Sequence, residues 1–200
     1  MNKLLMENEP KFNLKTVQDE FYNLKEDDIR DDNEIEAIVN IYSKTKDLSV
    51  RNTCLMLLYN KNNNILKIFF ETAYKKERYL DMKIRALRGL MHFIPENDVK
   101  KLLAKFNEVL KKRKKTTPYN YQEYELLLGK NSLPYLYKKY QYECIKETLD
   151  IVQNQYDEMP EAFKGNITYD ENGKTVYLRK LGEIKKRMTD FLEQEREKYK

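Results

Sequence analysis

The sequence predicts an all-α protein: a short helical repeat solenoid or bundle that ends in a small β-hairpin and a terminal helix. Three observations support this fold class. Apolar residues recur at three- and four-residue steps along most of the chain, as one face of a helix requires. Only 5 glycines and 5 prolines occur among 200 residues, which leaves little room for long loops. A helix-start pattern also occurs twice, at Asp47 and again at Asp81.

The first half of the chain predicts a short capping helix within residues 12–27 and then two helix pairs. In each pair, the first helix (33–46 or 65–78) is followed by a second helix that opens with Asp47 or Asp81. The predicted core residues of the first helices are Ile35, Ile38, Val39, Tyr42, Ile65, Ile68, Phe69 and Ala73. Those of the second helices are Val50, Cys54, Leu57, Leu58, Ile84, Leu87, Leu90 and Met91. Each Asp is expected to act as an N-cap or a first-turn acid.

The repeated pattern is Asp-x-x-Val/Ile-Arg, formed by Asp47 and Arg51 and again by Asp81 and Arg85. At the start of a second helix it resembles the HEAT repeat, an α-solenoid unit of two helices. The resemblance covers residues 33–93 and implies that the Asp and Arg side chains link neighbouring repeats, mostly through pairing with acidic residues. The alternative is an ordinary helical bundle whose helix caps coincide.

A third helix pair is expected after Pro95. Its first helix spans 95–115 and has an apolar face made of Val99, Leu102, Leu103, Phe106, Val109 and Leu110. Its partner, within 120–130, lacks the Asp-x-x-Val-Arg pattern, so the number of true repeats stays open. Residues 132–156 then predict one continuous helix, the longest in the protein, with Ser132 as its cap.

The last forty residues change character. Asn172-Gly173 lies between two β-prone runs, which is a strong hairpin signal. The terminal segment places Leu181, Ile184, Met188, Phe191 and Leu192 on one helix face. Such a small hairpin must pack against the helical body. We therefore predict a helical domain over residues 1–158, with a hairpin and amphipathic helix over 159–200 packed on it.

The residue types that most enzymes need are scarce. The chain has one histidine, His92, which is expected to be packed at a helix end. The two cysteines, Cys54 and Cys144, fall in apolar helical patterns and are expected to be buried reduced thiols, as in a cytosolic protein. No Cys-x-x-Cys pair or glycine-rich phosphate loop occurs. The sequence therefore predicts a cytoplasmic, non-enzymatic protein with no catalytic, cofactor or metal site and no membrane span.

Charge is locally segregated, although the net charge is only +5. An acidic segment includes Asp27, Asp28, Asp31 and Asp32. It is either a solvated interhelix loop or a docking patch for a basic partner. A basic run contains Lys111, Lys112, Arg113, Lys114 and Lys115. It is expected to be exposed, either as cations at a helix C-terminus or as a contact for phosphate or acidic protein.

Aromatic residues complete the set of candidate binding residues. The chain has 16 tyrosines and no tryptophan. Those following the basic run and in the predicted long helix include Tyr119, Tyr121, Tyr135, Tyr137 and Tyr142. They cannot all face one core, because successive side chains of a helix point in different directions. Surface tyrosines suit a protein interface, and beside cations they also suit stacking on single-stranded nucleic acid.

The leading hypothesis is a protein-binding module that acts by occlusion or scaffolding. The Lys-, Asn- and Tyr-rich composition resembles bacterial or phage accessory proteins of AT-rich genomes, which include inhibitors, immunity proteins and regulators. The alternative is a nucleic-acid-binding HEAT-like protein, of which the alkylpurine DNA glycosylases are the enzymatic extreme. A homodimer through the tyrosine-rich helix is a third possibility.

Overall fold

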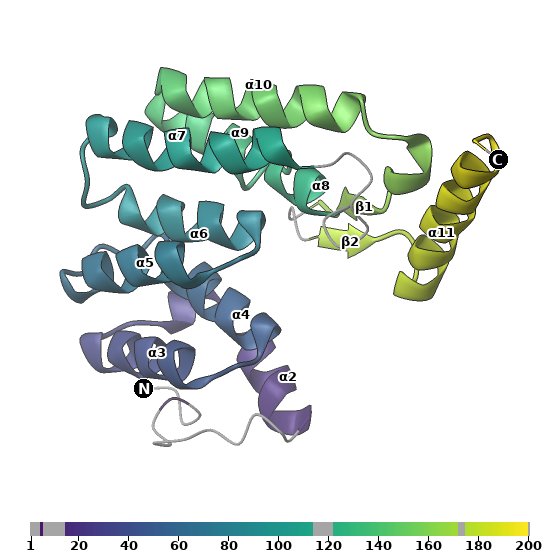
Figure 1. Ribbon diagram of the computed structural model, residues 1–200. Helices are drawn as coiled ribbons and strands as arrows, with labels where there is room; N and C mark the ends of the chain where they lie inside the picture. Colours follow the sequence, from purple (N-terminus) through teal and green to yellow (C-terminus); the bar gives the residue numbers. More distant parts are fainter. Residues whose placement is uncertain (1–4, 6–14, 114–121, 172–174, 200) are drawn as a thin grey trace. The chain divides into compact units, whose positions relative to one another are not determined.

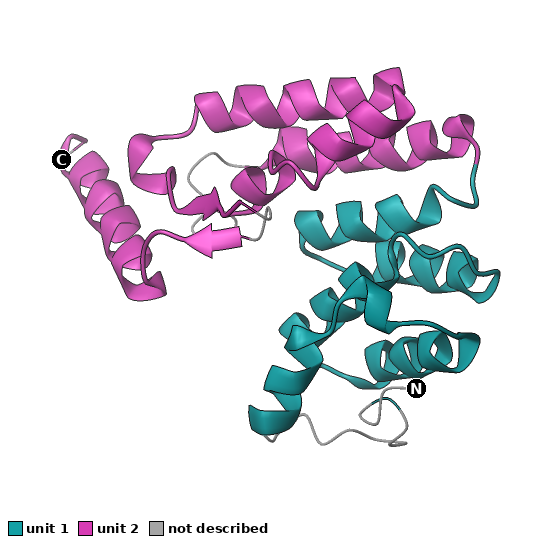
Figure 2. Cartoon of the chain, turned by 180° about the vertical axis from the view of Figure 1, so that it is seen from behind, with its two compact units in different colours: residues 1–94 teal, residues 95–200 magenta. Residues whose placement is uncertain are grey.

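The computed structural model describes residue 5 and residues 15–113, 122–171 and 175–199, and it confirms the all-α fold class (Figure 1). It is 71% helical, with ten α-helices among the described residues and a two-stranded hairpin before the terminal helix. The chain divides into two compact units, Met1–Ile94 and Pro95–Lys200 (Figure 2). This division differs from the one predicted at residue 158, which stays a prediction.

Unit 1 consists of a capping helix and two helix pairs. Its elements are α2 (Lys15–Asn23), η1 (Glu26–Asp28), α3 (Asp32–Lys44), α4 (Leu48–Leu58), α5 (Ile65–Lys76) and α6 (Leu80–Leu90). Helix α3 packs against α4, α5 against α6, and α4 against α6, while α2 covers α4. The predicted plan of this half of the chain is therefore confirmed.

The two repeated aspartates occupy the two expected kinds of position. Asp47 is the N-cap of α4, where its carboxylate accepts hydrogen bonds from the backbone N–H groups of Ser49 (2.7 Å) and Val50 (3.0 Å). Asp81 lies in the first turn of α6 and forms an ion pair with Arg85 of the same helix (3.4 Å). Both carboxylates lie near the positive end of a helix dipole, where acidic groups are stabilising.

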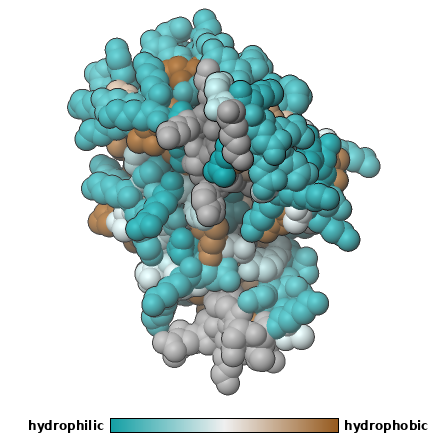
Figure 3. Space-filling model, turned by 45° about the vertical axis from the view of Figure 1, so that its right-hand side comes forward, coloured by the Kyte–Doolittle hydropathy of each residue, from teal (hydrophilic) through white to brown (hydrophobic). Residues whose placement is uncertain are grey.

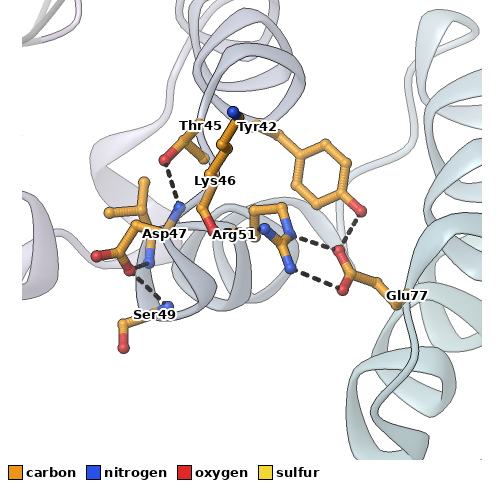
Figure 4. Close-up of polar contacts among 8 residues, drawn as sticks. Tyr42, Thr45, Lys46, Asp47, Ser49, Arg51 and Glu77 are labelled. Carbon is orange, nitrogen blue, oxygen red and sulfur yellow. Dashed lines mark hydrogen bonds and ion pairs between the residues drawn. The ribbon is translucent and has the colours of Figure 1, made fainter.

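The repeated arginines both form ion pairs with acidic side chains. Arg51 forms an ion pair with Glu77, which directly follows α5, and the hydroxyl of Tyr42 in α3 donates to the same carboxylate (Figure 4). Arg85 contacts Asp81 and also donates to the side-chain oxygen of Asn52 in α4. The first helix pair is thus joined to the second by buried and partly buried polar contacts.

The residues predicted as the core of α4 and α6 are all buried, but α5 buries a different face from the predicted one. Ile65 and Ile68 are exposed, at 38% and 71%, so their prediction as core residues is wrong. Helix α5 instead buries Leu66 and Phe70 together with Phe69, Ala73 and Tyr74. The ring of Phe70 lies directly against Gly89 of α6, where any side chain would occupy the same space. Close packing on the α6 backbone therefore selects the face of α5.

Unit 2 contains α7 (Glu96–Lys112), α8 (Glu123–Leu127), α9 (Leu133–Tyr140), α10 (Glu143–Asp157), η2 (Glu161–Phe163), β1 (Ile167–Tyr169), β2 (Thr175–Tyr177) and α11 (Leu181–Glu197). Helix α10 packs against α7, α8 and α9. The face of α7 is largely as predicted, with Val99, Leu103, Phe106 and Leu110 buried. Val109 is 48% exposed, so its placement in the core is wrong.

The prediction of one continuous helix over residues 132–156 is wrong. Gln141 adopts a left-handed conformation (φ 57°) that ends α9, and its backbone N–H donates to the carbonyl of Tyr137 (2.9 Å). Its side-chain amide also donates to the carbonyl of Lys138 (3.0 Å). These bonds close the end of α9 and let α10 start in a new direction, from which it packs back on α9. Ser132 occupies the N-cap position of α9, but its side chain makes no capping hydrogen bond, so the predicted side-chain cap is not formed.

The hairpin is held to unit 2 by Glu125 of α8. Its buried carboxylate accepts hydrogen bonds from the backbone N–H groups of Gly165 (2.6 Å) and Asn166 (3.1 Å) and from the hydroxyl of Tyr156 (2.9 Å). The hydroxyl of Tyr169 in β1 donates to the backbone carbonyl of Glu125 (2.9 Å). Strands β1 and β2 are antiparallel. The predicted Asn172-Gly173 turn lies outside the described residues.

Helix α11 packs through part of its predicted face. Ile184 and Met188 are buried, and the ring of Phe191 meets Phe163 edge to face at 5.8 Å. Leu181 is 56% exposed, so its assignment to the buried face is wrong. The exposed start of α11 continues directly from the exposed end of β2, which creates a surface described below.

Candidate protein-binding surface

The predicted acidic patch mostly stabilises the local structure of unit 1. Asp28 and Asp31 accept hydrogen bonds from backbone N–H groups at the starts of η1 (2.8 Å) and α3 (2.9 Å). Asp32 accepts one from the side-chain amide of Asn63 (2.7 Å). Asp27 is exposed. The segment therefore contributes helix caps and a loop contact, and Asp27 is its most available charge.

The predicted basic run is not uniformly exposed. Lys111 and Lys112 are exposed at the end of α7. Arg113 instead forms an ion pair with Glu123 of α8, and the two side chains are only 15% and 5% exposed. The expectation that the whole run is a free surface is therefore wrong at Arg113, where a buried carboxylate needs a cation. Four predicted binding residues lie outside the described residues: Lys114, Lys115, Tyr119 and Tyr121.

The remaining predicted tyrosines surround the break between α9 and α10. Tyr135, Tyr137 and Tyr142 are half-buried. The ammonium group of Lys139 lies 5.9 Å from the ring centre of Tyr135 and 5.1 Å from that of Tyr140. Lys139 and the rings of Tyr135 and Tyr140 therefore form a cluster of two aromatic rings and a cation. Cation–π contacts of this kind contribute about 0.5–1 kcal/mol at exposed sites.

A surface that the sequence did not predict lies where β2 leads into α11. Four apolar or aromatic side chains are exposed there: Val176 (40%), Tyr177 (57%), Leu178 (57%) and Leu181 (56%). We call these residues the β2–α11 surface. On the face shown in Figure 3, hydrophilic residues predominate and hydrophobic ones form small separate groups. Four such side chains within six residues are therefore a concentration of exposed apolar area.

The β2–α11 surface borders a shallow open cleft of about 680 Å³. Tyr177, Leu178 and Leu181 form apolar parts of its wall, and Arg179 and Lys180 lie among them. A binding site commonly combines apolar contact area with a few polar or charged groups that fix orientation. The cleft supplies both kinds of group from consecutive residues.

The same segment is strongly basic. Residues 175–187 contain five basic residues (179, 180, 185, 186 and 187) and one acidic residue, Glu183. The guanidinium group of Arg179 donates to the backbone carbonyl of Gly165, and that of Arg187 donates to the backbone carbonyl of Glu161 in η2. Lys180 and Lys185 are exposed, as is residue 186. The apolar surface is therefore bordered by positive charge that favours acidic molecules.

Sequence reasoning missed this surface because it predicted only that the hairpin packs against the helical body. A two-stranded hairpin anchored through β1 cannot cover both faces of β2. The available signal was the run Val176-Tyr177-Leu178, which has no polar residue to mark a solvent face and is followed at once by Arg179 and Lys180. Three consecutive apolar residues on a two-residue period must place at least one of them outward.

Other classes of site lack support in the described residues. No group of three or more His, Cys, Asp or Glu side chains is arranged there to hold a metal ion. No described helix combines the length and apolar character needed to cross a membrane. His92 is half-buried, and its Nε2 lies 3.2 Å from the carbonyl oxygen of Tyr59, as expected for a packed helix-end histidine. Both cysteines are buried and free.

Comparison of the chain with models of protein families, with curated proteins and with solved structures found no match.

Proposed function

We propose that this chain is a non-enzymatic protein-binding module that acts by occlusion or scaffolding, as an inhibitor, immunity protein or regulator does. The observation that carries the proposal is the β2–α11 surface, where Tyr177, Leu178 and Leu181 are each more than half exposed. Aromatic residues are enriched at protein interfaces, and the buried core of an interface is more apolar than the rest of the surface. A partner that covers them gains about 25 cal/mol for each Å² of apolar area removed from water.

The HEAT resemblance supports the same class of function. The Asp47 cap, the Arg51–Glu77 ion pair and the stacking of α4 on α6 are compatible with two successive HEAT-like repeats in unit 1. Helical repeat proteins present extended binding surfaces, so most of their known roles are in binding. Exposed charges of the predicted set, such as Asp27, Lys111 and Lys112, would set the rate and salt dependence of association.

We also propose a cytoplasmic location. Its support is the pair of buried free thiols, Cys54 and Cys144, one in each unit. Unpaired cysteines persist in the reducing cytosol, whereas exported proteins more often contain disulfides.

The test is affinity capture from native lysate of the source organism, with and without nuclease, read by mass spectrometry. The wild-type chain is compared with a surface variant, Tyr177→Ser/Leu178→Ser/Leu181→Ser. A matched control removes three similarly exposed apolar side chains elsewhere, Met56→Ser/Ile68→Ser/Val109→Ser (44%, 71% and 48% exposed). We expect one stoichiometric protein that survives nuclease, is lost from the surface variant and is retained by the control. Retention by both variants would contradict this placement of the site.

A second candidate function is binding of single-stranded nucleic acid. It is favoured by the cluster on α9, where Lys139 lies over the rings of Tyr135 and Tyr140. Rings beside cations can stack on bases while the cations contact phosphates. In this case capture would be sensitive to nuclease and lost on Lys138→Glu/Lys139→Glu substitution, with the surface variant unaffected.

A further inference from the structure

We infer that β2 binds an extended, acidic segment of the partner as an additional β-strand. This inference rests on the protein-binding function proposed above and names the chemistry of the partner. Addition of a strand to an exposed sheet edge is a common mode of peptide recognition, in which backbone hydrogen bonds supply affinity and side chains supply specificity. Three observations on β2 support it.

The first observation is the hydrogen-bond register of the hairpin. The backbone N–H of Leu178 donates to the carbonyl of Asn166 (2.9 Å), and Tyr177 is opposite Ile167. Hydrogen-bonded and non-hydrogen-bonded pairs alternate along an antiparallel ladder. Tyr177 therefore belongs to a non-hydrogen-bonded pair, and so does Thr175. Their N–H and C=O groups point away from β1, towards the outer edge of β2.

The second observation is the exposure of this edge. Within the described residues the sheet has two strands, so β1 occupies only one side of β2. The side chains of Val176, Tyr177 and Leu178 are all substantially exposed. An added strand would place alternate side chains beside Tyr177 on one face and beside Val176 and Leu178 on the other. Apolar residues at alternate positions of the partner would thereby lose contact with water.

The third observation is charge, which selects the occupant. Arg179 and Lys180 directly follow the edge in the sequence, and Lys185 is exposed on α11. Positive charge beside the edge attracts an acidic strand and opposes pairing between two copies of the same edge. A heterologous acidic segment thus fits the edge better than a second copy of this chain does.

The test uses the full chain and a fluorescein-labelled peptide in which glutamate alternates with valine, with binding followed by fluorescence anisotropy. We expect saturable binding that weakens as salt is added. A peptide in which lysine replaces glutamate should bind roughly tenfold more weakly or worse. Methylation of alternate backbone amides of the glutamate peptide should weaken binding to a similar extent, because it removes the donors that pair with Tyr177.

Variants of the chain test the same edge from the other side. Lys180→Glu should weaken binding of the glutamate peptide and strengthen binding of the lysine peptide. Lys105→Glu, which changes an exposed lysine on α7, should alter the binding of neither peptide. Tyr177→Pro removes the outward N–H and should abolish binding, whereas Tyr177→Phe should retain it. A thermal unfolding curve for each variant identifies any loss of fold. The N-methylated peptide tests, on the unchanged chain, the companion bond in which the carbonyl of Tyr177 accepts from the peptide N–H.

The outcomes separate this inference from the proposed function. Equal binding of the N-methylated and parent peptides, or absence of saturable binding, would overturn strand addition. The protein-binding function would still stand if the surface variant lost its captured protein. Conversely, specific peptide binding without any loss of capture in the surface variant would show that the edge of β2 can accept a strand, but it would overturn β2 as the site that binds the captured partner. A dimer in sedimentation equilibrium that dissociates on Tyr177→Pro substitution would show a second copy as the occupant and overturn the acidic partner.

Discussion

Arg51 of α4 and Glu77, the residue after α5, form a two-pronged ion pair in which Nε lies 2.9 Å from Oε1 and Nη2 lies 3.3 Å from Oε2. The Glu77 side chain is 1% exposed, and the Tyr42 hydroxyl donates a third hydrogen bond to it at 2.5 Å (Figure 4). The hydrogen bond between the Arg51 guanidinium and the Glu77 carboxylate raises the pKa of Arg51. One buried carboxylate thus joins three segments of unit 1.

Removal of the Arg51 side chain should destabilise unit 1 strongly. Arg51→Ala leaves the Glu77 charge buried without its cation, which we expect to lower the free energy of unfolding by about 3 kcal/mol. Urea unfolding measures the loss. Glu77→Gln in the same background should restore part of it, because the uncompensated charge is gone. Lys67→Ala, an exposed lysine on α5, is the control. A stability equal to that of the control would contradict a structural role for the ion pair.

Gly89 should not tolerate alanine, although it lies in a helix. Alanine has a helix propensity about 1 kcal/mol better than that of glycine. A Cβ at Gly89 would, however, meet the ring of Phe70, which is fully buried. Overpacking in a core costs about 1–3 kcal/mol, so the clash should outweigh the propensity. We expect a lower thermal midpoint for Gly89→Ala, partly restored by Phe70→Leu. An increase in the midpoint would show that α5 and α6 are not in this close contact.

Neighbouring cations at the end of α7 should respond differently to charge reversal. Lys112→Glu changes an exposed residue and should alter the free energy of unfolding by no more than about 0.5 kcal/mol. Arg113→Glu would place a second acid against buried Glu123 and should cost about 3 kcal/mol or more. Denaturant unfolding of the two single variants, which differ by one position in the chain, provides the comparison. Equal stabilities would mean that Arg113 is a surface charge, as the sequence predicted.

Stability should fall as pH rises above about 10, because buried tyrosines resist ionisation. Burial, reinforced by the charge of Glu125, raises the pKa of Tyr156 to about 12, and burial also raises the pKa of Tyr124. Unfolded tyrosine ionises near pH 10, so above that pH the folded state holds more protons and is disfavoured. Lys83 has a lowered pKa from burial and acts in the opposite direction. The slope of unfolding free energy against pH should therefore be compared between wild type and Tyr156→Phe, and identical slopes would contradict the prediction.

Features set by local chemistry were predictable from the sequence, whereas those set by distant contacts were not. The Asp47 cap depends on N–H groups two and three residues away, so its sequence pattern was sufficient. The partner of Arg51 is Glu77, 26 residues later, and only packing brings them together. In α5, the run from Ile65 to Phe70 has apolar residues on several sides, so periodicity did not select the buried face. The helix break at Gln141 has neither glycine nor proline to mark it.

The candidate site shows the same contrast between features set by local chemistry and features set by distant contacts. Exposed Lys111 and Lys112 agree with the expected end of a helix, but the burial of Arg113 depends on Glu123 from the next helix. The β2–α11 surface depends on how the hairpin docks. Because β1 is bonded to α8 through Tyr169, the side chains of β2 remain exposed. No pattern within residues 175–181 specifies which of the two strands takes the inner position.

Glu125 should therefore control the candidate binding surface without being part of it. Its carboxylate accepts from the N–H groups of Gly165 and Asn166 at the start of the hairpin and from the Tyr156 hydroxyl. Glu125→Gln keeps the shape but removes the charge from these bonds, and hydrogen bonds to a charged group contribute about 1.5–3 kcal/mol. We expect faster amide hydrogen exchange in residues 163–171 and 175–180, measured by mass spectrometry, with unit 1 unchanged.

The same variant links the fold to the proposed function. Glu125→Gln retains Tyr177, Leu178 and Leu181, yet a loosened hairpin should present them less often in a binding geometry. Capture of the partner should therefore weaken, although less than in the surface variant. Glu171→Gln, an exposed carboxylate after β1, is the matched control and should change neither hydrogen exchange nor capture. If exchange in the hairpin stays at the wild-type rate in Glu125→Gln, the docking of β1 depends on apolar packing instead of this buried carboxylate.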